Sequence, residues 1–156
     1  MLKLFLSLVV FLLAAVSLIG FLRNWQINSR PSQKLFLQGT LPSPKLEGFY
    51  AGAVTFPTSW AGKKFDSANT TGVNIIKNNS GGQGEKYPFK TYTGNGLVDK
   101  NLQVLKIDYN IPGNPLWSRL ILDEIVEVEP GHYLGKMHVR LIPSFPFSVL
   151  YFELKK

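Results

Sequence analysis

The chain has 156 residues and carries 17 Lys and Arg against 10 Asp and Glu, a net charge of +7. Its 45% hydrophobic content excludes global disorder, because that much apolar surface can offset the entropy of ordering the chain. The absence of cysteine excludes disulfides, thiolate metal sites and cysteine nucleophiles. A basic surplus can attract nucleic acid or anionic lipid, but no Arg-rich helix, RNA-binding signature or zinc-finger spacing accompanies it. We therefore expect no nucleic-acid partner.

The first segment has the features of a membrane anchor. Residues 4–22 carry no charged side chain, and as a helix they would span about 28 Å, close to the hydrocarbon thickness of a bilayer. Lys3 and the small residues at 15–17 also fit a cleaved signal peptide. The apolar run continues past that point, which favours an uncleaved transmembrane signal-anchor over residues 1–22. The flanking charges barely discriminate orientation, but the short N-terminal tail favours a single-pass membrane protein with its folded domain on the non-cytoplasmic side.

Residues 23–45 differ in composition from the segments on either side. They are polar and punctuated by proline, which predicts a tether between the membrane and a β-barrel domain formed by residues 46–156. Within the tether, Leu35-Phe36-Leu37 is apolar enough to dock on that domain.

The rest of the chain has the spacing of an all-β domain. About eight short runs rich in β-branched and aromatic residues alternate with turn clusters, without a sustained helical period. They predict a small antiparallel up-and-down β-barrel, with a β-sandwich as the alternative. The sixth run has apolar residues on both faces, which suits a barrel wall whose inner side lines a pocket. The runs are Leu46–Thr55, Ala61–Phe65, Gly72–Lys77, Tyr87–Thr93, Gln103–Tyr109, Leu116–Val128, His132–Ile142 and Phe147–Leu154.

Residues with catalytic or metal-binding chemistry are few. The chain lacks the phosphate-binding, nucleophile-elbow and zinc-protease motifs, so we predict no catalytic residue, no metal and no cofactor. His132 and His138 are the two histidines, and one strand would hold them about 20 Å apart, too far to share a metal. We expect both on the surface or the rim, with a lone general base as the alternative for either.

Arg119 and Asp123 form the most suggestive charged pair. In one continuous strand they would share a face about 13 Å apart, so each would need partners from neighbouring strands. Three alternatives are open for Arg119: it grips an anionic ligand head group, packs over an aromatic ring at the barrel end, or faces solvent. Aromatic residues are numerous enough to line a ligand cavity. The segment Phe145-Pro146-Phe147 is expected to cap the barrel mouth or touch lipid.

Several short blocks, in order along the chain, resemble a known family. Gly48–Gly52 matches a G-x-W-x-G opening with Tyr50 in place of the Trp, and Trp60–Phe65 resembles the W-x-G-K-x-F block that follows it. The chain therefore resembles the GXWXG-type proteins with their C-terminal companion domain, which are similar to lipocalin-like, or calycin, barrels. The resemblance implies a fold and a binding role but no catalytic residues. The order is completed by blocks at 104–109, 119, 123–124, 133–137 and 150–154.

The sequence as a whole predicts a membrane-tethered lipocalin-like module that binds a hydrophobic or amphipathic small molecule. One alternative is an isomerase or hydrolase acting on an apolar substrate in the barrel, with His138, Asp123 or Tyr109 as acid or base. Another is an assembly factor that docks a membrane-protein partner through the acidic residues of 123–129. The residues expected to contact the ligand are Trp60, Tyr109, Trp117, Arg119, Asp123, Tyr133 and Tyr151.

Overall fold

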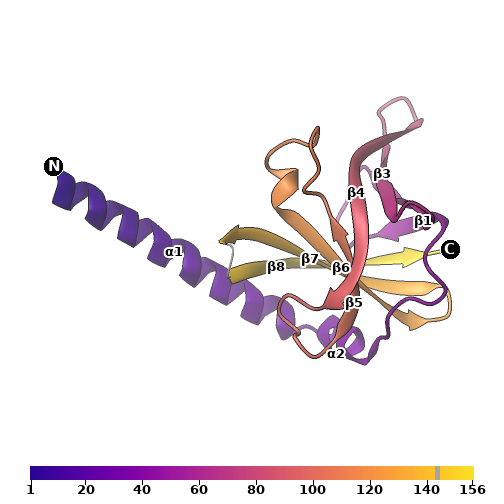
Figure 1. The fold of residues 1–156 in the computed structure, drawn as a ribbon, viewed down its shortest axis with the longest axis horizontal. Coiled ribbons are helices and arrows are strands. Elements are labelled where there is room, and N and C mark those ends of the chain that lie inside the picture. The colour runs from indigo at the N-terminus through magenta and orange to yellow at the C-terminus, as the bar shows by residue number, and fades with distance from the viewer. Residues whose placement is uncertain (143–144) are drawn as a thin grey trace.

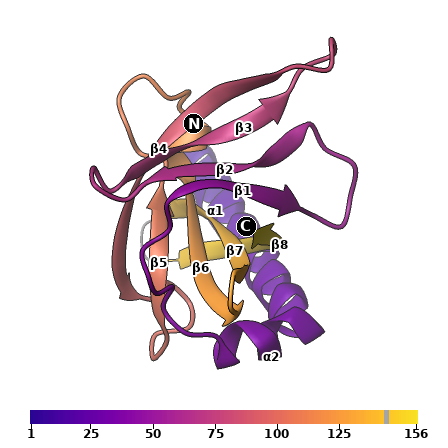
Figure 2. The ribbon, with the colours of Figure 1, turned by 90° about the vertical axis from the view of Figure 1, so that its right-hand side faces the viewer.

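The computed structural model describes residues 1–142 and 145–156, which form a closed antiparallel β-barrel and a long helix extending away from it (Figure 1, Figure 2). Each strand pairs with the next, and β8 pairs with β1 to close the wall. The predicted eight-strand barrel is confirmed, and the sandwich alternative is wrong. The elements are α1 (Leu2–Asn28), α2 (Pro31–Gln38), β1 (Gly48–Ala53), β2 (Trp60–Asp66), β3 (Thr71–Lys77), β4 (Gln83–Asn95), β5 (Gln103–Asp108), the 3-10 turn η1 (Ser118–Leu120), β6 (Ile121–Glu129), β7 (His132–Ile142) and β8 (Phe145–Lys155).

The meander gives the barrel two different ends. Because successive strands are antiparallel, the β1–β2, β3–β4, β5–β6 and β7–β8 connections meet at one end, which we call the mouth. The other three connections and the C-terminus lie at the opposite end, the base. The last turns of α1 run along β8, where Gly20 lies against the Phe147 ring and the Arg23 guanidinium donates to the Val149 carbonyl at 2.8 Å. The helix therefore leaves the barrel at the mouth.

Most of α1 is exposed. Its residues 2–14 are exposed, and the helix is long and apolar enough to cross a membrane, with a mean hydropathy of 2.8. A soluble helix buries one apolar face against a core, whereas this one is apolar all round and free. The sequence-based expectation of one N-terminal helix with the length and composition of a membrane span is confirmed to that extent.

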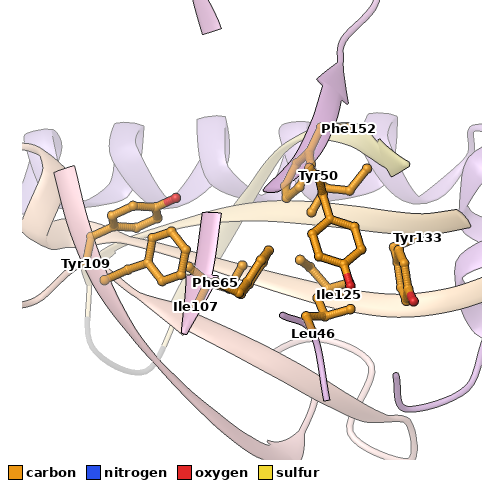
Figure 3. Packing of buried hydrophobic residues seen from close by; sticks show 10 residues of the cluster. Leu46, Tyr50, Phe65, Ile107, Tyr109, Ile125, Tyr133 and Phe152 are labelled. Atoms are coloured by element: carbon orange, nitrogen blue, oxygen red, sulfur yellow. The ribbon is translucent and has the colours of Figure 1, made fainter. Parts of the chain in front are cut away.

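An aromatic cluster fills the interior near the base (Figure 3). The Tyr50 ring meets Phe65 and Tyr133 edge-on, with centroids 5.6 and 5.5 Å apart. The ammonium of Lys156 lies 5.6 Å from the centre of the Tyr50 ring. Tyr50 thus closes this end of the barrel with a buried ring.

The expected tether over residues 23–45 is largely helical and packed on the barrel, which corrects the sequence-based interpretation. Ile27 of α1 and Phe36 of α2 are fully buried against the outer face of β6, β7 and β8. Beyond α2, Thr40 exchanges two backbone hydrogen bonds with Glu127, at 2.9 and 2.8 Å. Phe36 alone makes the docking contact expected of its segment, since Leu35 and Leu37 are exposed. The polar composition of the segment predicted a solvated linker. It did not indicate the docking, because only single apolar side chains of the segment, such as Ile27 and Phe36, make the contact with the barrel.

The long sixth run, predicted as one strand over Leu116–Val128, begins as a turn. The Ser118 backbone N–H and hydroxyl both donate to the Pro115 carbonyl, at 3.0 and 2.9 Å, and η1 follows. The strand β6 starts only at Ile121, so Arg119 and Asp123 do not share one strand. A side chain that bonds its own backbone offers the chain an alternative to the ladder, and the turn forms there.

The structure also contradicts the predicted surface positions of His138 and of the acidic residues in 123–129. His138 is fully buried on the outer wall, where its Nε2 lies 3.1 Å from Glu124 and its Nδ1 3.4 Å from the Ser148 hydroxyl. His132 is at the half-buried rim position expected, 3.0 Å from Glu153. The acidic residues of 123–129 do not form one docking patch, because Asp123 points into the barrel and Glu124 is fully buried outside it.

Candidate ligand-binding cavity

The upper part of the barrel interior, toward the mouth, is hollow. A cavity of about 210 Å³ lies above the aromatic cluster and opens between the connections of the mouth. Figure 3 shows Tyr109 at the opposite end of that cluster from Tyr133, where the packed core gives way to the cavity. Its apolar lining comes from strands and mouth loops alike, including Val54, Phe56, Ile76, Tyr87, Met137 and Leu150.

A polar cluster lies at the cavity wall inside this apolar lining. The Lys63 ammonium sits 2.9 Å from Asp123 Oδ2 and donates to Asn74 Oδ1 at 3.0 Å and to the Tyr109 hydroxyl. The Tyr109 hydroxyl in turn donates to Asp123 Oδ2 at 3.1 Å, and the Asn74 amide donates to Tyr109 at 3.0 Å. All four residues are buried, so their charges and dipoles act in a medium of low dielectric.

Burial controls the titration of this cluster. Removal from water lowers the pKa of Lys63, and the neighbouring Asp123 carboxylate only partly offsets that effect. Burial, together with the negative charge of Asp123, raises the pKa of Tyr109 well above its ordinary value. The rings of Trp60, Phe89, Tyr109 and Phe152 surround the ammonium at 5.1 to 5.4 Å, which favours the charged form of the lysine through cation–π attraction.

One atom of the cluster is left without a bond. Asp123 Oδ1 is buried, and no donor reaches it among the residues that the structure describes. A buried carboxylate oxygen without a donor costs free energy, on the order of 1–3 kcal/mol or more for a charged group. Because Asp123 lines the cavity, a molecule in the cavity can supply the missing donor.

Irregularities in the strands bring this cluster together. A register shift between Trp60 and Gly62 lets both Trp60 and Lys63 face inward, although residues three apart alternate in a regular strand. A second shift, between Gly72 and Asn74, accompanies the inward turn of Asn74. Sequence reasoning missed Lys63 and Asn74. The signals available were a lysine inside the W-x-G-K block and a lone asparagine in the apolar run at 73–76.

Four of the seven predicted ligand contacts line the cavity, namely Trp60, Tyr109, Trp117 and Asp123. The other three lie elsewhere. Tyr133 belongs to the aromatic cluster at the base. Tyr151 is on the outer face, where its hydroxyl bonds Gln33 of α2. Arg119 is not part of the cavity lining, and its Nε donates to Asn110 Oδ1 at 3.0 Å.

The proposed acids and bases are also separated by the wall. Tyr109 and Asp123 face the cavity, but His138 is buried on the outer side beneath α1, where it contacts Glu124 and Ser148. The cavity therefore contains no imidazole from His138 to exchange protons with a molecule bound there. Among the described residues that line it, the titratable groups are Lys63, Tyr109 and Asp123 of the polar cluster and Tyr87.

Comparison with known proteins bears on the fold alone. No family model matches the chain, and no curated protein matches it. A solved structure described as "Crystal structure of protein from Thermomonospora curvata" is similar to it, with a TM-score of 0.58 and 15% sequence identity. The match covers 80% of this chain and 84% of the other. Two chains at this identity share the barrel architecture, and function has to be argued from the site.

Proposed function

We propose that this protein is a membrane-anchored β-barrel that binds an amphipathic small molecule, with α1 as the anchor and the cavity at the mouth as the binding site. The single observation that carries the proposal is the cavity itself, apolar except for a buried carboxylate oxygen that lacks a donor. The resemblance to GXWXG-type, lipocalin-like barrels is in line with a binding role.

The size of the cavity limits the ligand. Pockets for drug-sized molecules usually measure about 300–1,000 Å³. At about 210 Å³, this cavity suits an alkyl or isoprenoid chain or a single ring system, with the rest of a longer molecule projecting through the mouth. The flexible Met137 side chain and the Leu150 side chain on the wall would accommodate chains of different shape.

The polar cluster limits the chemistry of the ligand. All three protons of the Lys63 ammonium have acceptors in Asp123, Asn74 and Tyr109, so an anionic ligand finds no free donor there. Asp123 Oδ1 offers an acceptor instead. We therefore expect a ligand with a hydroxyl or N–H group on an apolar body, in preference to a free carboxylic acid.

Photolabelling with a long-chain alkanol that carries a diazirine tests the proposal. The full chain, purified in detergent, is irradiated with the probe, and the labelled peptides are identified by mass spectrometry. We expect labels on strands that line the cavity, and a tenfold or greater loss in Met137→Trp, where the larger ring fills the space (about 1.4 kcal/mol or more of binding free energy).

Leu35→Trp is the matched control, because it makes the same kind of change on the exposed side of α2. It should label like the unmodified chain. The alkanoic acid with the same diazirine should label more weakly than the alkanol. Labelling of cavity peptides that is equal in Met137→Trp and in the unmodified chain would contradict the proposal.

The enzyme alternative has one observation in its favour, since Tyr109 and Asp123 face the cavity together. Their bonding opposes it. The raised pKa of Tyr109 keeps the phenol neutral at physiological pH. Asp123 Oδ2 is already paired with the Lys63 ammonium and accepts a hydrogen bond from the Tyr109 hydroxyl. The geometry favours binding over proton transfer.

A further inference from the structure

The position of α1 against the barrel fixes where the mouth must lie if the helix crosses a bilayer. Three polar contacts attach the helix to β8 near the mouth. Asn24 donates to the Pro146 carbonyl at 3.0 Å and accepts from the Ser148 N–H at 2.6 Å, and Arg23 donates to the Val149 carbonyl at 2.8 Å. The free part of the helix therefore continues outward past the mouth, as Figure 1 shows.

We infer that the mouth of the barrel is a membrane-binding surface, whose apolar rim inserts into the leaflet that α1 enters and opens the cavity directly to lipid. The inference rests on the proposed anchor role of α1 and extends the proposed binding function by naming the source of the ligand. The partner is a phospholipid bilayer, and the following steps give the reasons.

The apolar part of α1 is too short for the barrel to stand clear of the bilayer surface. Gly20 is buried against Phe147, and Ala15 and Val16 are already half-buried. If the bilayer surface lay below Ala15, clear of the barrel, residues 4–14 would supply only about 16 Å of apolar helix, half of what a span requires. A complete span needs the run up to residue 22, which brings Phe147 of β8, the residue against Gly20, to the depth of the lipid head groups.

The side chains at the mouth suit that depth. Large apolar side chains are exposed on two of its connecting segments and at the end of β7, with Phe56 at 51%, Leu116 at 78%, Trp117 at 58% and Leu141 at 52%. Such a cluster on a water-soluble end would cost solubility, whereas Trp and aliphatic residues are favoured at the membrane interface. Trp25, 68% exposed on α1 just beyond the apolar run, would lie at the same boundary.

The rest of the barrel differs from this rim. The β2–β3 connection at the base contains Asn69, and the β6–β7 connection follows Glu129, both exposed. The fourth connection of the mouth, residues 78–82, is polar, and Figure 1 shows it on the side of the barrel away from the free part of α1. The apolar rim is thus confined to the part of the mouth beside the anchor.

The rim and the cavity are continuous, since Phe56 and Trp117 both belong to the lining. A ligand would then pass between bilayer and cavity without crossing water. This arrangement matches a cavity of about 210 Å³ that holds only part of a long chain, because the remainder can stay among the lipid tails. The ligand class follows as a membrane-soluble alcohol or amide, drawn from the bilayer itself.

Single-cysteine labelling tests the inference directly, because the chain contains no cysteine. Leu116→Cys, Leu141→Cys and Asn69→Cys in the full chain are each labelled with the environment-sensitive fluorophore NBD and reconstituted into phosphatidylcholine–phosphatidylglycerol vesicles. We expect the labels at 116 and 141 to be blue-shifted and quenched severalfold more by nitroxide-bearing lipids than the label at 69. Iodide in the water should quench the label at 69 severalfold more strongly than the other two.

Equal exposure of all three labels to iodide would overturn the inference. That result is distinguishable from failure of the proposed function, because alkanol photolabelling in detergent does not require the rim to contact a bilayer. Cavity labelling with an exposed rim would leave a ligand-binding barrel that loads from water. A buried rim without cavity labelling would leave a membrane-docked barrel and remove the ligand.

Discussion

The barrel wall holds a buried lysine on each of its two sides, and the two are bonded differently. On the outside, the Lys136 ammonium donates to Asn28, Gln33 and Asp99 at 2.7, 2.9 and 2.8 Å. The second oxygen of Asp99 accepts from the Gln33 amide at 2.8 Å, so that carboxylate is fully bonded. On the inside, Lys63 also has three acceptors, but its carboxylate partner Asp123 keeps one oxygen without a donor.

The difference is that the outer cluster is complete within the chain, whereas the inner cluster is not. The outer cluster joins α1, α2, the β4–β5 connection and β7, and every bond within it is made by the chain itself. It holds the anchor helix in one orientation against the barrel. The inner cluster leaves an acceptor free beside an empty space, where a bound molecule would complete the bonding. Burying a charge costs free energy unless it is paired, and the proposed ligand would supply the donor that Asp123 lacks.

The largest effect is expected from Lys136→Met. Removal of the ammonium leaves the largely buried Asp99 carboxylate with only the Gln33 amide as a donor, and the Asn28 amide oxygen loses the ammonium as its donor. Breaking a buried ion pair in this way costs about 3–5 kcal/mol. We expect the free energy of unfolding of the full chain, measured by urea titration in a non-ionic detergent, to fall by that amount.

The control for this variant is Lys64→Met, which removes a lysine from an exposed pair with Glu85 at 3.0 Å. Exposed pairs contribute about 0–1 kcal/mol, so the control should unfold almost like the unmodified chain. A loss in Lys136→Met no larger than in Lys64→Met would show that the outer cluster does not hold the helices.

The inner pair gives the next largest effect and a sharper comparison. Lys63→Met should cost about 3 kcal/mol, at the low end of the range for a buried pair, because water entering the cavity can solvate Asp123. The double variant with Asp123→Leu replaces both charges by apolar side chains and should recover most of that loss. Alkanol photolabelling should nevertheless stay reduced in the double variant, since the acceptor for the ligand is gone.

Recovery of both stability and labelling in the double variant would assign the inner cluster to the fold alone. No such recovery is available on the outside. There, Lys136→Met combined with Asp99→Leu would still leave Asn28 and Gln33 without the ammonium. The two double variants therefore distinguish a pair that ends at a cavity from one embedded in a network.

Periodicity and composition predicted the residues inside the barrel better than those on its outer face. The aromatic content pointed to Trp60 and Tyr109, and alternation along the sixth run pointed to Asp123, because side chains in a strand alternate with period two; all three line the cavity. Lys63 was missed since the register shift at Gly62 breaks that alternation. A β-bulge depends on pairing with a partner strand, which the local sequence does not record.

The outer side could not be predicted because its contacts are distant in sequence. The Lys136 site needs Asn28 from α1 and Gln33 from α2, more than a hundred residues earlier. His138 was expected at the surface for the same reason, as nothing in its own strand indicates that α1 would cover it. Polar residues in a segment like 23–45 predict solvent exposure unless their partners are known, and here the partners are on the barrel.

The smallest effect concerns two of the buried tyrosines, Tyr109 inside the barrel and Tyr151 outside it. Burial raises the pKa of both above 10, with Asp123 adding to the effect on Tyr109 and Asp99 to that on Tyr151. Above pH 10 the unfolded chain releases phenol protons that the folded chain retains, so stability falls as pH rises, by up to about 1.4 kcal/mol per pH unit for each group. Lys63, whose pKa is lowered, contributes the opposite slope only below about pH 10.5.

Tyr92 and Tyr133 also have raised pKa values, so urea titrations between about pH 10.5 and 12 have to be compared between single variants to separate Tyr109 and Tyr151. Tyr109→Phe should cost about 1–2 kcal/mol at neutral pH, because Asn74 and Lys63 lose an acceptor, and should make the alkaline decline shallower. Tyr151→Phe should make the decline shallower in the same way. Alkanol photolabelling should change only in Tyr109→Phe, since Tyr151 is separated from the cavity by the barrel wall. A change of equal size in both variants would contradict the division between an inner binding cluster and an outer structural one.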